Sequence, residues 1–180
     1  MIPAFQLFIL NRKEAEAFTT ATPYAIVAVT DPDEADPSYI TSSFCRRILN
    51  LKVNDLRHPC CAKHRLFDDE HARQIVEFAH WFRDSGFTQL VVHCEAGVSR
   101  SSAIALAIAR FLGQEIDDVL NPFQRYRPNT FIYWRIVRAL MPGRELELLG
   151  ELFEWTARGA AVVVSAKDVE CSEVLQTTVK

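Results

Sequence analysis

Short apolar runs separated by turn-forming residues occupy the first half of the chain, a pattern typical of β-strands. Phe5 to Leu10 and Tyr24 to Val29 are rich in aromatic and β-branched residues, and Arg47 to Val53 alternates apolar and polar side chains. A fourth run, Gln89 to His93, has Leu-Val-Val at its centre and precedes a stretch of small residues. The pattern therefore predicts four short strands.

Helical spacing of apolar residues occurs between these strands, and after the fourth strand it continues as far as Arg158. Asp68 or Asp69 is the predicted N-cap of a helix that ends at Ser85-Gly86. The run from Ser101 to Leu112 is nearly all Ala, Ile and Leu, which predicts a buried helix. Four further helical segments are predicted: one or two turns within Asn11–Phe18, then Glu115–Leu120, Thr130–Leu140 and Arg144–Arg158.

Strands interleaved with helices, followed by helices alone, predict an α/β fold with a central mixed sheet covered by helices on both faces. We find no internal repeat or low-complexity linker, so we expect a single domain over residues 1–180. Within it, residues 160–180 contain Val162-Val163-Val164 followed by polar residues, and we expect either an edge strand or a flexible tail there.

Composition excludes several classes of protein. With Lys+Arg 20 against Asp+Glu 23, the formal net charge of -3 gives no whole-chain basic field for nucleic acid or an anionic membrane. No apolar run approaches the roughly 20 residues of a membrane span, and the first residues lack the basic region of a signal peptide. The five cysteines are an odd, irregularly spaced set, so we expect free thiols in a reducing cytoplasm.

The segment between the fourth strand and the apolar helix contains the candidate chemistry. Cys94 is followed by five residues and then Arg100, at the start of the helix. Backbone N–H groups of such a loop, together with the helix dipole, form a site for an anion and also favour a thiolate over a thiol. Arg100 offers a planar fork for two phosphoryl oxygens, and Gly97 permits a backbone conformation that a Cβ would block.

The pattern His93-Cys94-x5-Arg100-Ser101 resembles the phosphate-binding signature of the cysteine-dependent protein tyrosine phosphatases. The ending Ser99-Arg100-Ser101 is similar to that of the dual-specificity branch, and the resemblance extends from about Arg47 to about Leu140. It implies that Cys94 attacks phosphorus to form a phosphocysteine.

The resemblance also implies roles for the neighbours of Cys94. Ser101 would hydrogen-bond the sulfur and ease its departure, and His93 would orient the loop and help keep Cys94 ionised. Asn129, in an Arg-Pro-Asn sequence before a predicted helix, would brace the loop without taking part in catalysis. The phosphate oxygens would be bound by Arg100 and by the loop amides of Glu95, Ala96, Gly97, Val98, Ser99 and Arg100.

A general acid must protonate the departing oxygen, and two positions are candidates. Asp55 follows the third strand in an Asn-Asp context similar to the acid loop of the dual-specificity family. It lies farther from Cys94 in sequence than we expect for that family, and an insertion from Arg57 to Phe67 accounts for the excess. Asp68 or Asp69 is nearer in sequence, but a position before a helix favours a capping role.

We therefore expect a protein phosphatase for phosphotyrosine, with phosphoserine and phosphothreonine as further substrates of a shallow pocket. Two alternatives remain: a phosphopeptide-binding module without turnover, and a rhodanese-like sulfurtransferase, whose loop is usually shorter. No metal or organic cofactor is expected, since a thiolate, a guanidinium and a carboxylic acid suffice for this chemistry. The Cys and His residues from His58 to His64 fit no standard zinc spacing. Adjacent Cys60 and Cys61 suggest a disulfide with Cys94 under oxidation. The sequence predicts no particular oligomeric state.

Overall fold

A four-stranded sheet forms the centre of the protein in a computed structural model, which describes residues 5–57, 64–120 and 126–159. Its strands are β1 (Gln6–Asn11), β2 (Tyr24–Thr30), β3 (Cys45–Lys52) and β4 (Gln89–Cys94). Their order across the sheet is β1-β4-β2-β3, and all three described pairings are parallel. The antiparallel part of the expected mixed sheet is thus not found among the described residues. Each described connection crosses over, so each strand re-enters the sheet in the same direction.

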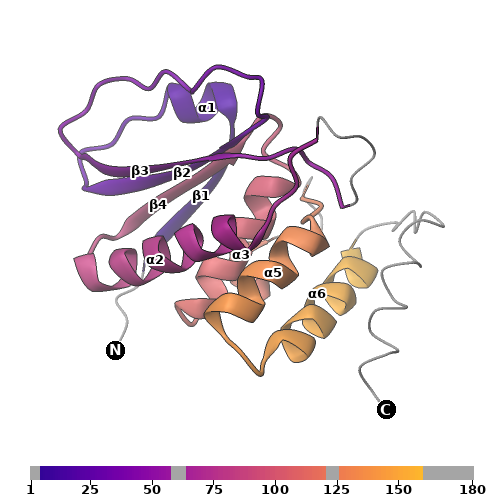
Figure 1. Ribbon diagram of the computed structural model, residues 1–180. Coiled ribbons are helices and arrows are strands. Elements are labelled where there is room, and N and C mark those ends of the chain that lie inside the picture. Colours follow the sequence, from indigo (N-terminus) through magenta and orange to yellow (C-terminus); the bar gives the residue numbers. More distant parts are fainter. Residues whose placement is uncertain (1–4, 58–63, 121–125, 160–180) are drawn as a thin grey trace, which may run out of the picture.

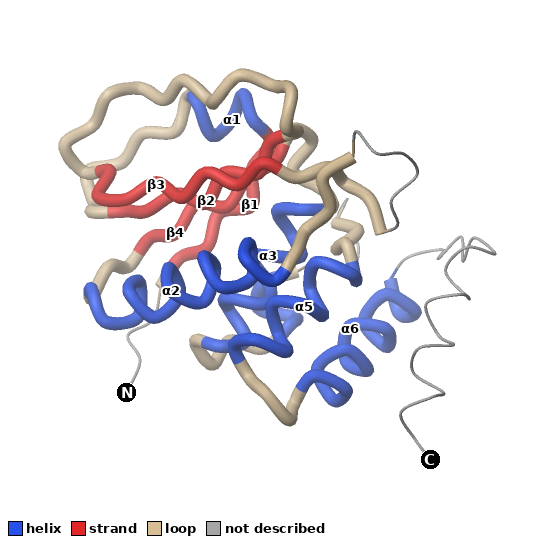
Figure 2. The backbone as a smooth tube through the Cα atoms, in the orientation of Figure 1, coloured by secondary structure: helices blue, strands red, loops and turns tan. Residues whose placement is uncertain are grey.

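Helices cover both faces of the sheet, which confirms the predicted α/β class (Figures 1 and 2). The short α1 (Arg12–Glu16) lies over one face with the loop that joins β2 to β3. On the other face lie α2 (Asp69–Ser85) and α3 (Arg100–Phe111), and α5 (Thr130–Leu140) packs against both. The remaining helices are α4 (Ile116–Val119) and α6 (Glu145–Gly159), and α6 packs on α5.

The described elements begin and end within two residues of the ends that the apolar pattern predicts. β2 is buried along its whole length because it pairs with β4 on one side and β3 on the other. Residues 160–180, for which an edge strand or a tail is expected, lie outside the described residues.

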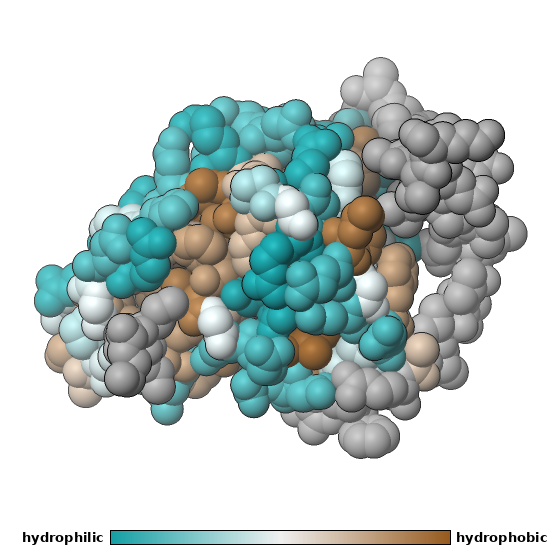
Figure 3. All heavy atoms as spheres, turned by 90° about the horizontal axis from the view of Figure 1, so that it is seen from below, coloured by the Kyte–Doolittle hydropathy of each residue, from teal (hydrophilic) through white to brown (hydrophobic). Residues whose placement is uncertain are grey.

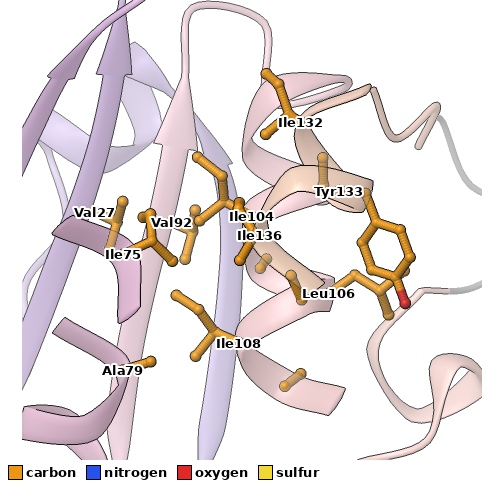
Figure 4. Close-up of a cluster of buried hydrophobic side chains, with 14 of the residues drawn as sticks. Val27, Ile75, Ala79, Val92, Ile104, Leu106, Ile108, Ile132, Tyr133 and Ile136 are labelled. Atoms are coloured by element: carbon orange, nitrogen blue, oxygen red, sulfur yellow. The ribbon is translucent and has the colours of Figure 1, made fainter. Parts of the chain in front are cut away.

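The core fills the space between the sheet and the helices α2, α3 and α5 (Figure 4). Ile104 of α3 and Val92 of β4 are fully buried within it, together with Ile136 of α5. α3 is buried on nearly every side, as its apolar sequence predicts, because the sheet lies on one side and α5 on the other. The helix is thereby held firmly behind the loop at its N-terminus, which contains the candidate chemistry.

Hydrophilic side chains cover most of the face seen from the helical side, and hydrophobic ones are visible between them (Figure 3). Among the described residues, no helix combines the length and the apolar character that a membrane crossing requires.

Ile104→Ala is expected to lower the free energy of unfolding by about 2–5 kcal/mol, because it leaves a cavity in a close-packed core. Ile48→Ala on β3 makes the same change at a side chain that is 42% exposed, and should cost about 1 kcal/mol or less. Urea unfolding followed by circular dichroism measures both. Equal losses in the two variants would contradict this assignment of the core.

Candidate active site

The loop from Glu95 to Ser99 joins the end of β4 to the start of α3, and one contact determines its path. Gly97 has φ +67, and a Cβ added there would lie 2.7 Å from the Leu10 carbonyl and from the backbone nitrogen of Asn11. The loop therefore passes directly against the end of β1, where no other residue fits. This close approach is the physical reason for the glycine that the sequence indicates.

Backbone groups of the same loop divide into satisfied carbonyls and unpartnered amides. Within the described chain, none of the N–H groups from Ala96 to Ser99 donates a hydrogen bond to another residue. Three carbonyls accept from N–H groups outside the loop: Glu95 from Arg12 at 3.2 Å, Val98 from Arg127 at 3.0 Å, and Ser99 from Asn129 at 3.2 Å. A concave run of free N–H groups at a helix N-terminus binds anions.

Cys94 is buried at the end of β4, with 3% of its surface exposed. Its Sγ lies 3.2 Å from Oγ of Ser101, in the first turn of α3. The neighbouring Ser102 instead donates its hydroxyl to the carbonyls of Val98 and Ser99, at 2.5 and 3.0 Å. The two serines thus differ in role: Ser101 can donate a hydrogen bond to the sulfur, whereas Ser102 stabilises the loop.

The Arg100 guanidinium is buried at the base of the loop and is held by two other loops. Nη1 donates to Asp31 at 3.0 Å and to the carbonyl of Val53 at 2.7 Å, and Nη2 donates to the second Asp31 oxygen at 3.4 Å. Nε is buried and has no hydrogen-bond partner among the described residues. Oδ2 of the Asp55 carboxylate lies 3.9 Å from this Nε. One edge of the guanidinium is therefore occupied, and the edge that contains Nε is not.

Asp55 lies just beyond the end of β3 and is tied to the Cys94 loop. Its Oδ1 accepts hydrogen bonds from Ser99 Oγ at 2.9 Å and from Asn129 Nδ2 at 2.8 Å. Asn129 is also the N-cap of α5, because its Oδ1 accepts from the backbone N–H groups of Phe131 and Ile132. The structure thus brings Asp55, Asn129 and the loop together.

The alternative acids, Asp68 and Asp69, have structural partners. Asp68 is the N-cap of α2 and forms a capping box with His71. Asp69 pairs with Arg135 at 2.8 Å and Arg138 at 3.5 Å, which joins the start of α2 to α5. Neither carboxylate has a described contact with the Cys94 loop.

His93 is completely buried beside Cys94, and its Nε2 lies 2.7 Å from the hydroxyl of Tyr39. Burial lowers the pKa of His93 to about 4, although the backbone of Cys94 and the carboxylate of Glu16 favour the charged form. The ring is therefore uncharged near neutral pH and contributes no positive charge to a thiolate.

Sequence reasoning missed three residues that organise this region. Asp31 directly follows the buried strand β2, and its position at the carboxyl edge of a parallel sheet could have indicated it. Arg12 contacts the carboxylates of Glu34 and Glu95, at 3.4 and 3.8 Å, and so ties the loop after β2 to the Cys94 loop. Tyr39 lies in a polar loop without periodicity, where no sequence signal marks it.

The disulfide and metal expectations concern residues that lie mostly outside the described part of the chain. Cys60 and Cys61 lie within 58–63, outside the described residues. Among the cysteines that are described, Cys45 and Cys94 are free thiols.

Two solved structures have the same fold. A human tyrosine phosphatase-like serine/threonine/tyrosine-interacting protein is 20% identical with a TM-score of 0.51, over 79% of this chain and 93% of that one. A mouse protein classed as a dual specificity phosphatase, complexed with zinc tungstate, is 17% identical with a TM-score of 0.51, over 79% and 86%. The chain thus has the fold of the dual-specificity phosphatases, and the resemblance to them is confirmed at the level of fold.

A family model described as dihydrouridine synthase matches residues 41–111. These residues include β3, α2, β4 and α3 but amount to less than half of the chain. Because a strand-helix-strand-helix segment occurs in many α/β folds, the match does not show that family. No curated protein matches the chain significantly.

Gly97→Ala is expected to displace the loop and to lower stability by at least 2 kcal/mol, roughly the sum of a left-handed backbone penalty and a backbone clash. Gly113→Ala is the matched control, because Gly113 also has positive φ, at +82, but has nothing within 4 Å of an added Cβ. The control should lose only about 1–2 kcal/mol. Chemical denaturation of both variants gives the difference, and equal losses would contradict the close approach at Gly97.

Acid is expected to destabilise the protein through His93. The unfolded ring binds a proton near pH 6.5 and the folded ring only near pH 4, so the unfolded state holds more protons between these values. Stability should therefore fall as the pH drops from about 6.5 to about 4, with a contribution on the order of 3 kcal/mol.

The pH dependence of unfolding, compared between the wild type and His93→Asn, isolates this contribution. Burial also lowers the pKa of His71, which affects the same pH range, but it does so in both proteins. A pH dependence equally steep in the variant would contradict the assignment to His93.

Proposed function

We propose that this protein is a phosphatase that hydrolyses phosphate monoesters on proteins through a phosphocysteine intermediate. One arrangement carries the proposal: around a single loop lie a cysteine sulfur, a run of N–H groups and a guanidinium edge, and neither the N–H groups nor that edge has a hydrogen-bond partner among the described residues. The dual-specificity phosphatase fold supports it. Catalysis of phosphoryl transfer consists mainly of positioning and charge stabilisation, which these groups supply.

The Arg100 guanidinium is the proposed phosphate clamp. It has five N–H donors, and Asp31 and Val53 take three of them. The remaining two, Nε–H and one Nη2–H, lie side by side on one edge of the planar group. Two oxygens of a phosphoryl group match that edge, and the free N–H groups of Ala96 to Ser99 can bind the oxygens from the loop.

In the first step, the Cys94 thiolate attacks phosphorus while the bond from phosphorus to the leaving oxygen breaks. The leaving oxygen takes a proton from the acid, and a phosphocysteine remains. In the second step, water attacks phosphorus and gives a proton to the same carboxylate, and the bond from phosphorus to sulfur breaks. The Ser101 hydroxyl, 3.2 Å from Sγ, stabilises the departing thiolate by a hydrogen bond.

Asp55 is the proposed acid and base. Ser99 and Asn129 both donate to its Oδ1, which holds the carboxyl group in place and leaves Oδ2 to carry the transferred proton. The first step requires the protonated form of Asp55 and the second step its ionised form.

Phosphorylated proteins or peptides are the proposed substrates, with phosphotyrosine first and phosphoserine and phosphothreonine also accepted. The loop offers Glu95 and no lysine, which disfavours a substrate with several phosphates. The whole chain would act as one domain in the reducing cytoplasm, in keeping with the free thiols of Cys45 and Cys94.

A phosphopeptide-binding module without turnover is the second candidate. The likeness to a human protein named phosphatase-like and interacting favours it. Against it, this chain has a cysteine, an arginine and a carboxylate around one loop, which binding alone does not require.

Hydrolysis of an aryl phosphate is expected to have a bell-shaped pH dependence and to be abolished in Cys94→Ser. Asp55→Asn keeps acceptors for Ser99 and Asn129 but has no proton to give, so kcat should fall about 10²–10⁴-fold. The fall of the rate on the basic side of the profile should also disappear in this variant.

Asp69→Asn is the matched control, because it removes a carboxylate that pairs with α5 and not with the loop. Its pH profile should equal that of the wild type. An unchanged profile in Asp55→Asn together with a changed one in Asp69→Asn would move the acid to the start of α2. A folded, reduced wild type that binds a phosphopeptide but shows no turnover would support the binding module instead.

A further inference from the structure

Asp31 makes an ion pair with Arg100 at the base of the site, and the sequence motif around Cys94 does not include it. β2 lies between β4 and β3 in the sheet, so the residue after β2 falls between the Cys94 loop and the Asp55 segment. The Arg100 side chain is 6% exposed and that of Asp31 is 33% exposed. A guanidinium with so little solvent exposure is destabilised when it loses one of its partners.

Several contacts hold the Asp31 carboxylate itself in place. Pro32 follows it directly and biases the Asp31 backbone towards extended conformations. Oδ1 of Asp31 accepts a hydrogen bond from Asn54 Nδ2 at 3.0 Å, in addition to the one from Arg100 Nη1. Asn54 is in turn fixed by two hydrogen bonds with the backbone of Arg65, both 2.9 Å. The Asp31 carboxylate is therefore held in one position, from which it can orient the Arg100 guanidinium.

We infer that Asp31 is a positioning residue that turns the Nε edge of Arg100 towards the phosphoryl group. The inference rests on the proposed function and names a residue that controls it. Asp31 engages the two Nη atoms, so rotation of the guanidinium in its plane would break both hydrogen bonds. With Asp31 present, the edge that faces substrate is preorganised before substrate arrives.

Charge alone predicts the opposite effect of Asp31, which makes the inference testable. Removal of a carboxylate beside an anion site should strengthen anion binding, because it removes a repulsion. If orientation dominates, Asp31→Asn should instead weaken it. We expect kcat/KM for an aryl phosphate to fall about 10–100-fold, the range typical of a lost orienting contact.

The experiment compares the wild type, Asp31→Asn, Arg100→Lys and the double variant. If Asp31 acts through Arg100, Asp31→Asn should change kcat/KM less than about twofold in the Arg100→Lys background. Asp33→Asn is the matched control, because it removes an exposed carboxylate of the same loop, and it should match the wild type. Additive losses in the double variant, or tighter phosphate binding by Asp31→Asn, would overturn the inference. Asp31→Glu should recover part of the activity if folding is intact.

An NMR measurement separates this inference from the proposed function. The Nε–H signal of Arg100, assigned by its loss in Arg100→Lys, should be sharp in the wild type and should shift on addition of inorganic phosphate. In Asp31→Asn it should broaden, and more phosphate should be needed to shift it. This result without any turnover would leave Asp31 as a positioning residue in an anion-binding protein and would reject the phosphatase. An unchanged signal in Asp31→Asn would reject the role of Asp31.

Discussion

Burial of the Arg100 guanidinium is the constraint on which the rest of the site depends. A buried positive charge needs fixed partners, and here they come from the ends of two different strands, as Asp31 after β2 and Val53 after β3. The parallel sheet supplies them because the carboxyl ends of its strands meet at one edge. The same geometry places Cys94 at that edge, and α3 begins one loop later.

Two further contacts give the loop its shape. Gly97 passes so close to the end of β1 that no side chain fits, and Asn129 at the start of α5 binds both the loop and Asp55. β1 precedes the loop in the sequence and α5 follows it, so segments from both sides of the loop in the sequence contact it. α3 is buried behind it, so the cost of moving the loop includes the cost of disturbing the core.

Most of the fold followed from local patterns. The four strands and the helices were predictable because apolar periodicity and turn residues act over a few neighbours, and α3 was apolar enough to be identified as buried. The all-parallel pairing of the described strands was not predictable, because strand direction depends on crossovers that no local pattern records. The protonation state of His93 was likewise not predictable, because its lowered pKa results from complete burial.

By itself, the sequence determined which residues could carry the chemistry, because Cys94, Arg100 and Ser101 are close neighbours whose spacing has a local meaning. It also placed Asp55 among the candidate acids. Only the tertiary structure decided which carboxylate contacts the loop and which oxygen of Asp55 accepts the hydrogen bonds from Ser99 and Asn129. It alone placed Asp31 against the guanidinium, 69 residues away in sequence. The physical reason is that hydrogen bonds and ion pairs depend on distance in space, which here is set by the strand order β1-β4-β2-β3.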